Sequence, residues 1–194
     1  MLLALDVAIL PPRHVNQLAI ELSAALPSNE SHGLRLDDTH LPHVTLTQLF
    51  VREDELDLAY QKIDETLKGV PPLQLMITGA EKGATSIALT IDNTPELQQL
   101  HERLMEALRG VERPGGTAHA FAGGKARVGD VLWVSSYRLA AAFAKYWPHI
   151  TLGHGNKAPD VAPVSFQASQ IAVCHLGRFC SCHVVKRLWT LGAS

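Results

Sequence analysis

The chain has 194 residues, of which 46% are hydrophobic and 19% are charged. This composition is typical of a globular protein and excludes a disordered chain, and the length allows one domain or two small lobes that share a cleft. The formal net charge of −2 at pH 7 argues against a broad surface for long duplex nucleic acid, which needs many phosphate contacts.

The first ten residues are apolar, but Asp6 interrupts them and Pro11 and Pro12 stop them. Because this segment has no basic start and is too short for a membrane span, we expect a core strand over residues 2–10, not a signal peptide. The 3 cysteines, an odd number, fit a reducing compartment. We therefore expect a cytoplasmic protein without a membrane segment.

Apolar spacing and turn residues divide the first half of the chain into helices and strands. Acidic residues at 53–57 mark a helix start, where they complement the helix dipole, and Gly69 ends that helix. The other elements expected in this half are a helix over residues 12–26, a short strand over 32–36, a strand over 42–51, and a hairpin of strands 73–78 and 85–92.

In the second half, Thr94 followed by Pro95 predicts a helix start, and Gly110 predicts its end. The glycine-rich segment 111–130 is expected to be a functional loop, because loops of this length seldom serve only as connections. A helix is expected over residues 136–146, a strand after Pro148, and paired strands over 164–176 and 182–191. Segregated strands and helices indicate the α+β class.

One five-residue pattern occurs twice: residues 42–46 read Pro-His-Val-Thr-Leu and residues 148–152 read Pro-His-Ile-Thr-Leu. Both copies are rich in β-branched residues, so each is expected to begin a strand. Strand alternation places His43, Thr45 and Thr47 on one face of the first strand. A purely structural strand would more often carry Val or Ile at these positions, since buried His and Thr need partners.

The second copy has the same alternation. His149 and Thr151 are expected on one face, and Ile150 and Leu152 on the other, where His154 should also lie. Each strand thus presents one imidazole beside one hydroxyl. We expect the two strands to face a common cleft.

These two motifs resemble the signature of the two-histidine (2H) phosphoesterase superfamily, which includes the 2′-5′ RNA ligase family and cyclic-nucleotide phosphodiesterases. That signature is a pair of His-x-Thr/Ser-x motifs with hydrophobic x, about half a chain apart. The resemblance covers nearly the whole sequence. It implies a single domain over residues 1–194, made of two similar, intertwined lobes with antiparallel sheets and outer helices, related by a pseudo-two-fold axis, with the active-site cleft between them.

Two histidines can hydrolyse a cyclic phosphodiester by accepting a proton from water and donating one to the leaving ribose oxygen. Thr45 and Thr151 can donate hydrogen bonds to the nonbridging phosphate oxygens. This chemistry requires no metal and no cofactor. The resemblance implies that His43 is the acid and that His149 is the base. It also implies that the substrates are RNA ends or small nucleotides with a 2′,3′-cyclic phosphate, and that the product carries a 2′-phosphate. The reverse activity that it implies is 2′-5′ ligation.

Aromatic and basic residues near the second motif are candidates for substrate binding. An aromatic ring can stack on a base, and a cation can contact phosphate. For each residue taken singly, packing or a solvated charge is the more common role. The candidates are Tyr137, Tyr146, Trp147, Lys125, Arg127 and Arg138.

Two other groupings could in principle bind a metal: His40 and His43 with Asp37 and Asp38, and the cysteines near residues 174–183 with two neighbouring histidines. In the first grouping, Leu41 and Pro42 break the regular geometry between His40 and His43, and no matching ligand set occurs near His149. The cysteine grouping fits no standard zinc spacing. A second enzyme interpretation keeps the two histidines but changes the substrate to another cyclic phosphate, such as an ADP-ribose derivative. A non-catalytic module that binds RNA ends or nucleotides is the alternative from a different class. We expect a monomer.

Overall fold

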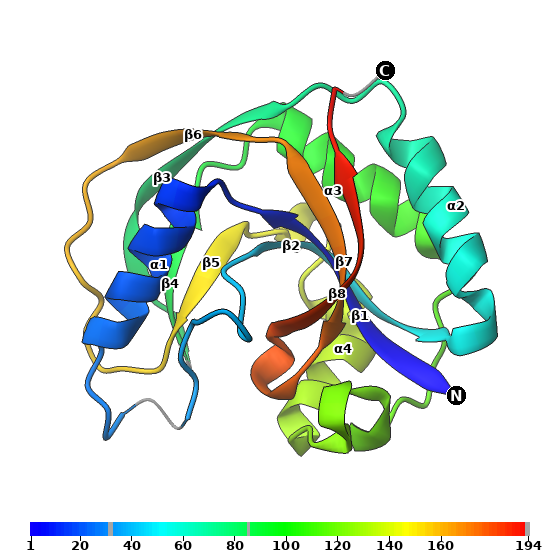
Figure 1. The fold of residues 1–194 in the computed structure, drawn as a ribbon, viewed down its shortest axis with the longest axis horizontal. Coiled ribbons are helices and arrows are strands. Elements are labelled where there is room, and N and C mark those ends of the chain that lie inside the picture. The colour runs from blue at the N-terminus through cyan, green and yellow to red at the C-terminus, as the bar shows by residue number, and fades with distance from the viewer. Residues whose placement is uncertain (31–32, 85, 193–194) are drawn as a thin grey trace.

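A computed structural model of the protein describes residues 1–30, 33–84 and 86–192. Its strands form two four-stranded sheets: sheet 1, in the order β2-β1-β7-β8, and sheet 2, in the order β5-β4-β3-β6 (Figure 1). All neighbouring strands are antiparallel. The bounds are β1 (Leu2–Leu10), β2 (Val44–Arg52), β3 (Leu73–Lys82), β4 (Ile87–Ile91), β5 (His149–Gly153), β6 (Val164–Ala168), β7 (Gln170–Leu176) and β8 (Cys182–Thr190).

Four α-helices accompany the sheets: α1 (Arg13–Ala25), α2 (Leu56–Leu67), α3 (Pro95–Leu108) and α4 (Val128–Ala140). Helix α1 follows β1 of sheet 1 but packs against β5 of sheet 2, whereas α3 follows β4 of sheet 2 and packs against β2 of sheet 1 (Figure 1). Each sheet therefore takes a helix from the chain segment of the other. This exchange confirms the predicted α+β architecture with antiparallel sheets and outer helices.

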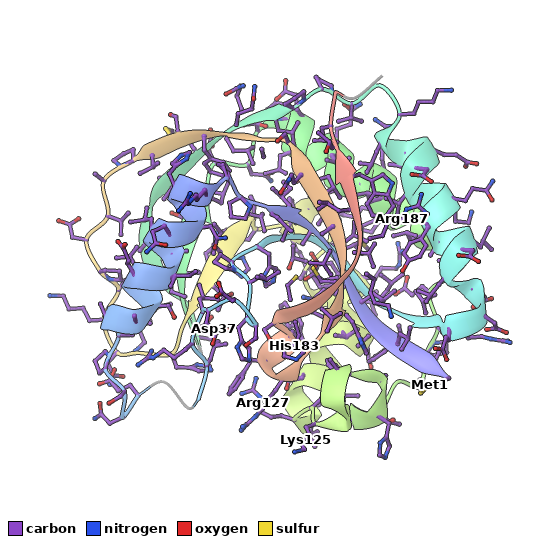
Figure 2. All side chains as sticks on the ribbon, viewed as in Figure 1. Met1, Asp37, Lys125, Arg127, His183 and Arg187 are labelled. Carbon is purple, nitrogen blue, oxygen red and sulfur yellow. The ribbon has the colours of Figure 1, made fainter. Side chains whose placement is uncertain are left out.

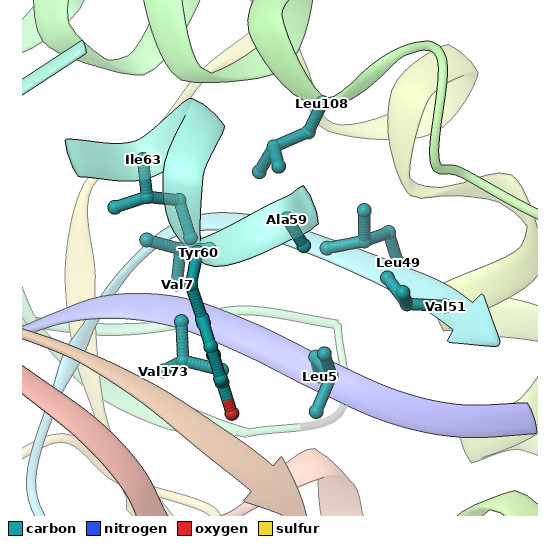
Figure 3. A pocket seen from close by; sticks show the side chains of 9 residues that line it. All are labelled: Leu5, Val7, Leu49, Val51, Ala59, Tyr60, Ile63, Leu108 and Val173. Atoms are coloured by element: carbon teal, nitrogen blue, oxygen red, sulfur yellow. The ribbon is translucent and has the colours of Figure 1, made fainter. Parts of the chain in front are cut away.

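The two faces of sheet 1 have different environments. Leu5 and Val7 of β1 point toward α2 and line a cavity of about 10 Å³ between the sheet and that helix (Figure 3). Since this volume is at the lower limit for a single water molecule and the lining is apolar, the cavity is a packing gap in the core. It is too small to hold a ligand.

The opposite face of β1 carries Ala4 and Asp6. Ala4 and its neighbour Phe50 are covered by Phe121 and by Val134 of α4. Asp6, two residues further along β1, is fully buried as well, and β2 of sheet 1 contacts β5 of sheet 2. The strands of the two repeated motifs therefore lie next to each other.

Most of the predicted elements are confirmed within one or two residues, including β1, α1, α2 and β2. The single strand predicted over residues 164–176 was wrong, because this segment forms β6 in sheet 2 and β7 in sheet 1. The predicted start of α3 is correct because the Leu97 amide donates a 3.3 Å hydrogen bond to the hydroxyl of Thr94. Among the described residues, no helix combines the length and the apolar character that a membrane span needs.

The prediction for α4 was wrong. This helix starts at Val128, not at residue 136, and ends at Ala140, so it takes up the last part of the predicted loop. The cause is local: the Asp130 carboxylate accepts hydrogen bonds from the backbone and the side chain of Arg127 and so caps the first turn. A positive φ of 59° at Phe143 then separates the helix from β5.

The predicted strand over residues 32–36 was also wrong for residues 33–36. Residue 32 lies outside the described residues, and residues 33–36 form no strand. Leu36 instead donates its amide to the hydroxyl of Ser23, and the Arg35 side chain donates to the carbonyl of Leu26. Both bonds tie this segment to the end of α1. The predicted hairpin is β3 and β4, although residue 85 of its second strand also lies outside the described part.

Candidate active site

The histidines of the two repeated motifs are held in the same way. Nδ1 of His43 lies 2.7 Å from the carbonyl oxygen of Leu41, and Nδ1 of His149 lies 2.8 Å from that of Trp147. Because a carbonyl oxygen only accepts hydrogen bonds, Nδ1 carries the hydrogen in both rings. Each histidine therefore directs Nε2 away from its own backbone, where it is available for proton transfer.

A β-bulge follows the threonine of the first motif. Thr45 pairs with Ala8 of β1, but Thr47 pairs with the next residue of that strand, Val7. The extra residue, Leu46, reverses the alternation. Thr47 consequently joins the core face with Val7, so the prediction that it shares a face with His43 was wrong.

A matching bulge corrects the prediction for His154. In β5, Thr151 pairs with Ala88 and Gly153 with Ile87, so Leu152 is the extra residue. His154 therefore lies on the side of His149, and its ring centroid is 5.5 Å from that of Phe179, which comes from the β7–β8 connection. It faces the other lobe instead of the core.

Two side chains join the two motifs. The Tyr146 hydroxyl donates a 2.9 Å hydrogen bond to the carbonyl of Thr45. The His101 ring of α3 stacks on Tyr146, donates from Nδ1 to the carbonyl of Leu46 and accepts at Nε2 from the amide of Phe143. Burial lowers the pKa of His101, which keeps the ring in the neutral form that these two bonds require.

A buried carboxylate lies behind the first motif. Asp6 is fully buried and accepts 2.7 Å hydrogen bonds from the Thr45 hydroxyl and the Gln48 amide. Its Oδ2 is 3.7 Å from Nε2 of His43. Burial raises the pKa of Asp6, against the charge of His43 and the hydrogen bonds from Gln48 and Thr45. The Thr45 hydroxyl proton is thus directed to Asp6.

The second motif has an aromatic ring instead of a carboxylate. The Trp147 ring stacks on His149 with centroids 4.3 Å apart. Burial lowers the pKa of His149, the hydrogen bond to the Trp147 carbonyl opposes this shift, and the charge of His43 adds to it. His149 is therefore a neutral imidazole with a basic Nε2. The Thr151 side chain makes no hydrogen bond within the described part of the chain, so its hydroxyl is available to a ligand.

The other residues singled out in the sequence lie in different places. Tyr137 is buried, with its ring edge-on to that of Trp133. The Arg138 guanidinium forms an ion pair with Glu112 and donates to the carbonyl of Met105. Neither Tyr137 nor Arg138 therefore offers an exposed side chain beside the two histidines. Tyr146 is buried as well, whereas Trp147 is 43% exposed.

Lys125 and Arg127 lie near each other at the lower edge of the view in Figure 2. Lys125 is exposed, and Arg127 pairs with Asp130 while its guanidinium lies 3.9 Å above the ring of Phe179. Arg127 also lines a cavity of about 540 Å³ with His154. The remaining lining residues are Asn29, Glu30, Lys82, Ala84, Gly155 and Asn156.

Sequence reasoning missed Asp6, Gln48 and His101. The available signal for Asp6 was a single carboxylate in an otherwise apolar strand, since such a group needs partners when it is buried. His101 gave a similar signal among the leucines of α3. Nothing in the sequence connected Gln48 to Asp6, because the connection depends on the bulge in β2.

The fold and the paired motifs define a two-lobed α+β protein with a histidine contributed by each lobe. The sequence profile described as "2′-5′ RNA ligase superfamily" matches residues 11–172. The chain belongs to the 2′-5′ RNA ligase superfamily. No curated protein is similar enough in sequence to count as a match.

Solved structures with the same fold cover almost the whole chain. Escherichia coli LigT complexed with NADP⁺ has a TM-score of 0.65 and 18% identity, over 98% of this chain and 99% of that one. The protein TT0787 of Thermus thermophilus has a TM-score of 0.63 and 19% identity, over 97% and 98%. LigT complexed with 3′-AMP gives 0.64 and 18%, over 98% and 99%. At these identities the likeness establishes the fold alone.

Proposed function

We propose that the protein is a metal-independent cyclic phosphodiesterase that opens 2′,3′-cyclic phosphate at RNA ends or in small nucleotides. The observation that carries this proposal is the matched pair of Nδ1-to-carbonyl hydrogen bonds, which leaves Nε2 of both His43 and His149 available. Binding alone would not require two titratable groups. Proton removal on one side of phosphorus and proton delivery on the other do require them.

His149 is proposed as the base and His43 as the acid. The lowered pKa of His149 supports its neutral form, which can accept a proton from the attacking water. Nε2 of His43 lies 3.7 Å from Oδ2 of Asp6, and as the acid His43 delivers a proton from this nitrogen to the departing ribose oxygen. In the reverse, ligating direction the two roles exchange.

The two threonines are proposed to contact phosphate unequally. Thr151 has a hydroxyl free to donate to a nonbridging oxygen. Thr45 can donate in the same way only when its hydroxyl gives up the 2.7 Å hydrogen bond that it donates to Asp6. We therefore assign the larger share of phosphate binding to Thr151.

The substrate class is supported by the surroundings of His149. Trp147 is exposed enough to contact a base. The 540 Å³ cavity near His154 and Arg127 has a volume typical of ligand sites and carries cationic groups from both lobes. E. coli LigT is recorded with NADP⁺ and with 3′-AMP. A nucleotide or the end of an RNA fits this setting, and a product with a 2′-phosphate is proposed.

Phosphorus NMR of 2′,3′-cyclic AMP with the purified protein in EDTA tests the proposal. Conversion to a single monophosphate by the wild type, and none by the double variant His43→Ala/His149→Ala, is expected. The chemical shift identifies which ribose oxygen leaves. If the wild type converts neither this nucleotide nor an RNA with a cyclic phosphate end, while nucleotides still bind, the non-catalytic binding module replaces the proposal.

A further inference from the structure

Three different metal-ligating side chains meet behind the first motif. Atoms of Asp6, His43 and Cys182 all lie within 4.8 Å of one another. They come from β1, from the residue before β2 and from the start of β8. Neither metal grouping considered from the sequence contains this set.

The backbone fixes this meeting. The Leu41 amide donates a 2.9 Å hydrogen bond to the carbonyl of Cys182, which holds the segment before His43 against β8. Asp6 pairs across the sheet with Cys174 of β7, and β7 pairs in turn with β8, which begins at Cys182. The cluster therefore rests on strand pairing and does not depend on a flexible loop.

The polar atoms of the cluster are incompletely satisfied. Asp6 is fully buried, and its Oδ2 accepts both available hydrogen bonds, but Oδ1 has no hydrogen-bond partner in the described chain. An orphaned carboxylate oxygen is costly in the interior. It also places negative charge beside a proposed phosphate site, which weakens anion binding. A bound cation would remove both costs.

The ligand set selects the kind of cation. One thiol, one imidazole and one carboxylate suit Zn²⁺, whereas Ca²⁺ and Mg²⁺ require mostly oxygen ligands. Neighbouring ligand atoms of a tetrahedral zinc site lie roughly 3.3–3.8 Å apart. The 3.7 Å between His43 Nε2 and Asp6 Oδ2 fits this range, and Sγ of Cys182 lies within 4.8 Å of the ligand atoms of both residues. Thr45 and Gln48 then orient the carboxylate as outer hydrogen-bond donors.

We propose that Asp6, His43 and Cys182 form a Zn²⁺ site, with water in the fourth position, and that the bound metal switches the two-histidine reaction off. Zinc takes the lone pair on Nε2 of His43, the same position that must carry the proton in turnover. The Cys182 thiol loses its proton to solvent on binding. The metal site stands on its own geometry, whereas the inhibition rests on the proposed function.

Cobalt(II) titration of the metal-free protein tests the site without any substrate. We expect one equivalent of Co²⁺ to produce a thiolate-to-cobalt charge-transfer band that Zn²⁺ then abolishes by displacement. Cys182→Ser should lose the band, and Cys180→Ser is the matched control that should keep it, because the Cys180 thiol points to the carbonyl of Asp130. No band in the wild type, or a full band in Cys182→Ser, would overturn the site.

His43→Gln covers the case in which Cys182→Ser fails to fold, which circular dichroism detects. This variant should bind Zn²⁺ about tenfold more weakly or worse, and unchanged affinity would contradict the assignment. In turnover, each variant is compared with its own rate in EDTA. Zinc should inhibit the wild type and Cys180→Ser alike, reversibly by EDTA, and inhibit Cys182→Ser far less. Binding without inhibition would overturn the switch but leave the site, and absence of turnover would remove the proposed function and the switch with it but also leave the site.

Discussion

The two lobes repeat one backbone design around their motifs. His43 and His149 each donate Nδ1–H to the carbonyl two residues earlier. The threonine of each motif pairs with an alanine, Ala8 or Ala88, and a bulge follows it in both strands. The backbone therefore presents the two imidazoles in equivalent ways.

The side chains behind the motifs break this equivalence. Beyond the first bulge, Gln48 pairs with Asp6. The corresponding positions of the second lobe, one residue beyond the last pair formed by β4 and β5, are His154 and Ser86. A carboxylate thus supports one motif only. On the proposed reaction, this difference turns two similar histidines into an acid and a base.

Removal of either catalytic candidate should have the largest effect. His43→Ala and His149→Ala should each lower kcat/KM for a cyclic phosphate by about 10²–10⁴-fold, because each removes one proton-transfer group. The double variant should be little worse than either single one, since the two groups act as a unit. Steady-state rates in EDTA measure this.

The control for these variants is His14→Ala, an exposed histidine of α1 that should leave the rate unchanged. Circular dichroism must find all the variants folded. A folded His43→Ala or His149→Ala protein with the wild-type rate would remove the two-histidine mechanism.

The link between the motifs through α3 can be broken at His101. In His101→Leu, the carbonyl of Leu46 and the amide of Phe143 lose their partner, which should cost about 2–4 kcal/mol of unfolding free energy. Urea denaturation measures this, with His14→Leu as the surface control. A loss no larger than that of the control would mean that water replaces the ring without cost.

Local patterns were enough to predict the two motif strands and both histidines from the sequence. Strand periodicity, a proline before each motif and the repeated residues all act over a few positions. The faces beyond each threonine were predicted wrongly for Thr47 and His154, because a one-residue bulge reverses every later side chain. No local residue type announces such a bulge here.

The support behind the motifs could not be predicted for a different reason. Asp6 meets Thr45 and Gln48 only after β1 and β2 have paired, and Cys182 joins them from the far end of the chain. Likewise, α4 starts at Val128 because the Asp130 side chain caps the first turn by accepting hydrogen bonds from Arg127. The glycine-rich composition before this turn favoured a loop instead. These contacts depend on tertiary structure or on one side-chain bond.

A smaller effect is expected from the hydrogen bond between the lobes. Tyr146→Phe removes the donor to the Thr45 carbonyl but keeps the ring that stacks on His101, so it should cost about 1 kcal/mol of unfolding free energy. Tyr60→Phe, on α2, is the matched control. Equal stability of the two variants would show that the ring alone joins the motifs.

The smallest effect, and the one that tests the asymmetry most directly, concerns Trp147. If neutral His149 is the base, kcat/KM falls as the pH drops through the pKa of His149, which burial holds below its ordinary value of 6.5. Trp147→Ala lets water reach the ring, so this pKa should rise and the low-pH limb should move to higher pH. Trp133→Ala, at another exposed tryptophan, should leave the limb in place.

The direction of that shift separates the two role assignments. His43 also faces His149, and its charge lowers the pKa of His149 whether or not Trp147 is present. If the low-pH limb of kcat/KM moves to higher pH in Trp147→Ala and not in Trp133→Ala, the group that titrates is the histidine stacked on Trp147. This result identifies His149 as the base. A limb that stays fixed would belong to another group, and the carboxylate behind His43 would then have to be reconsidered as support for a base.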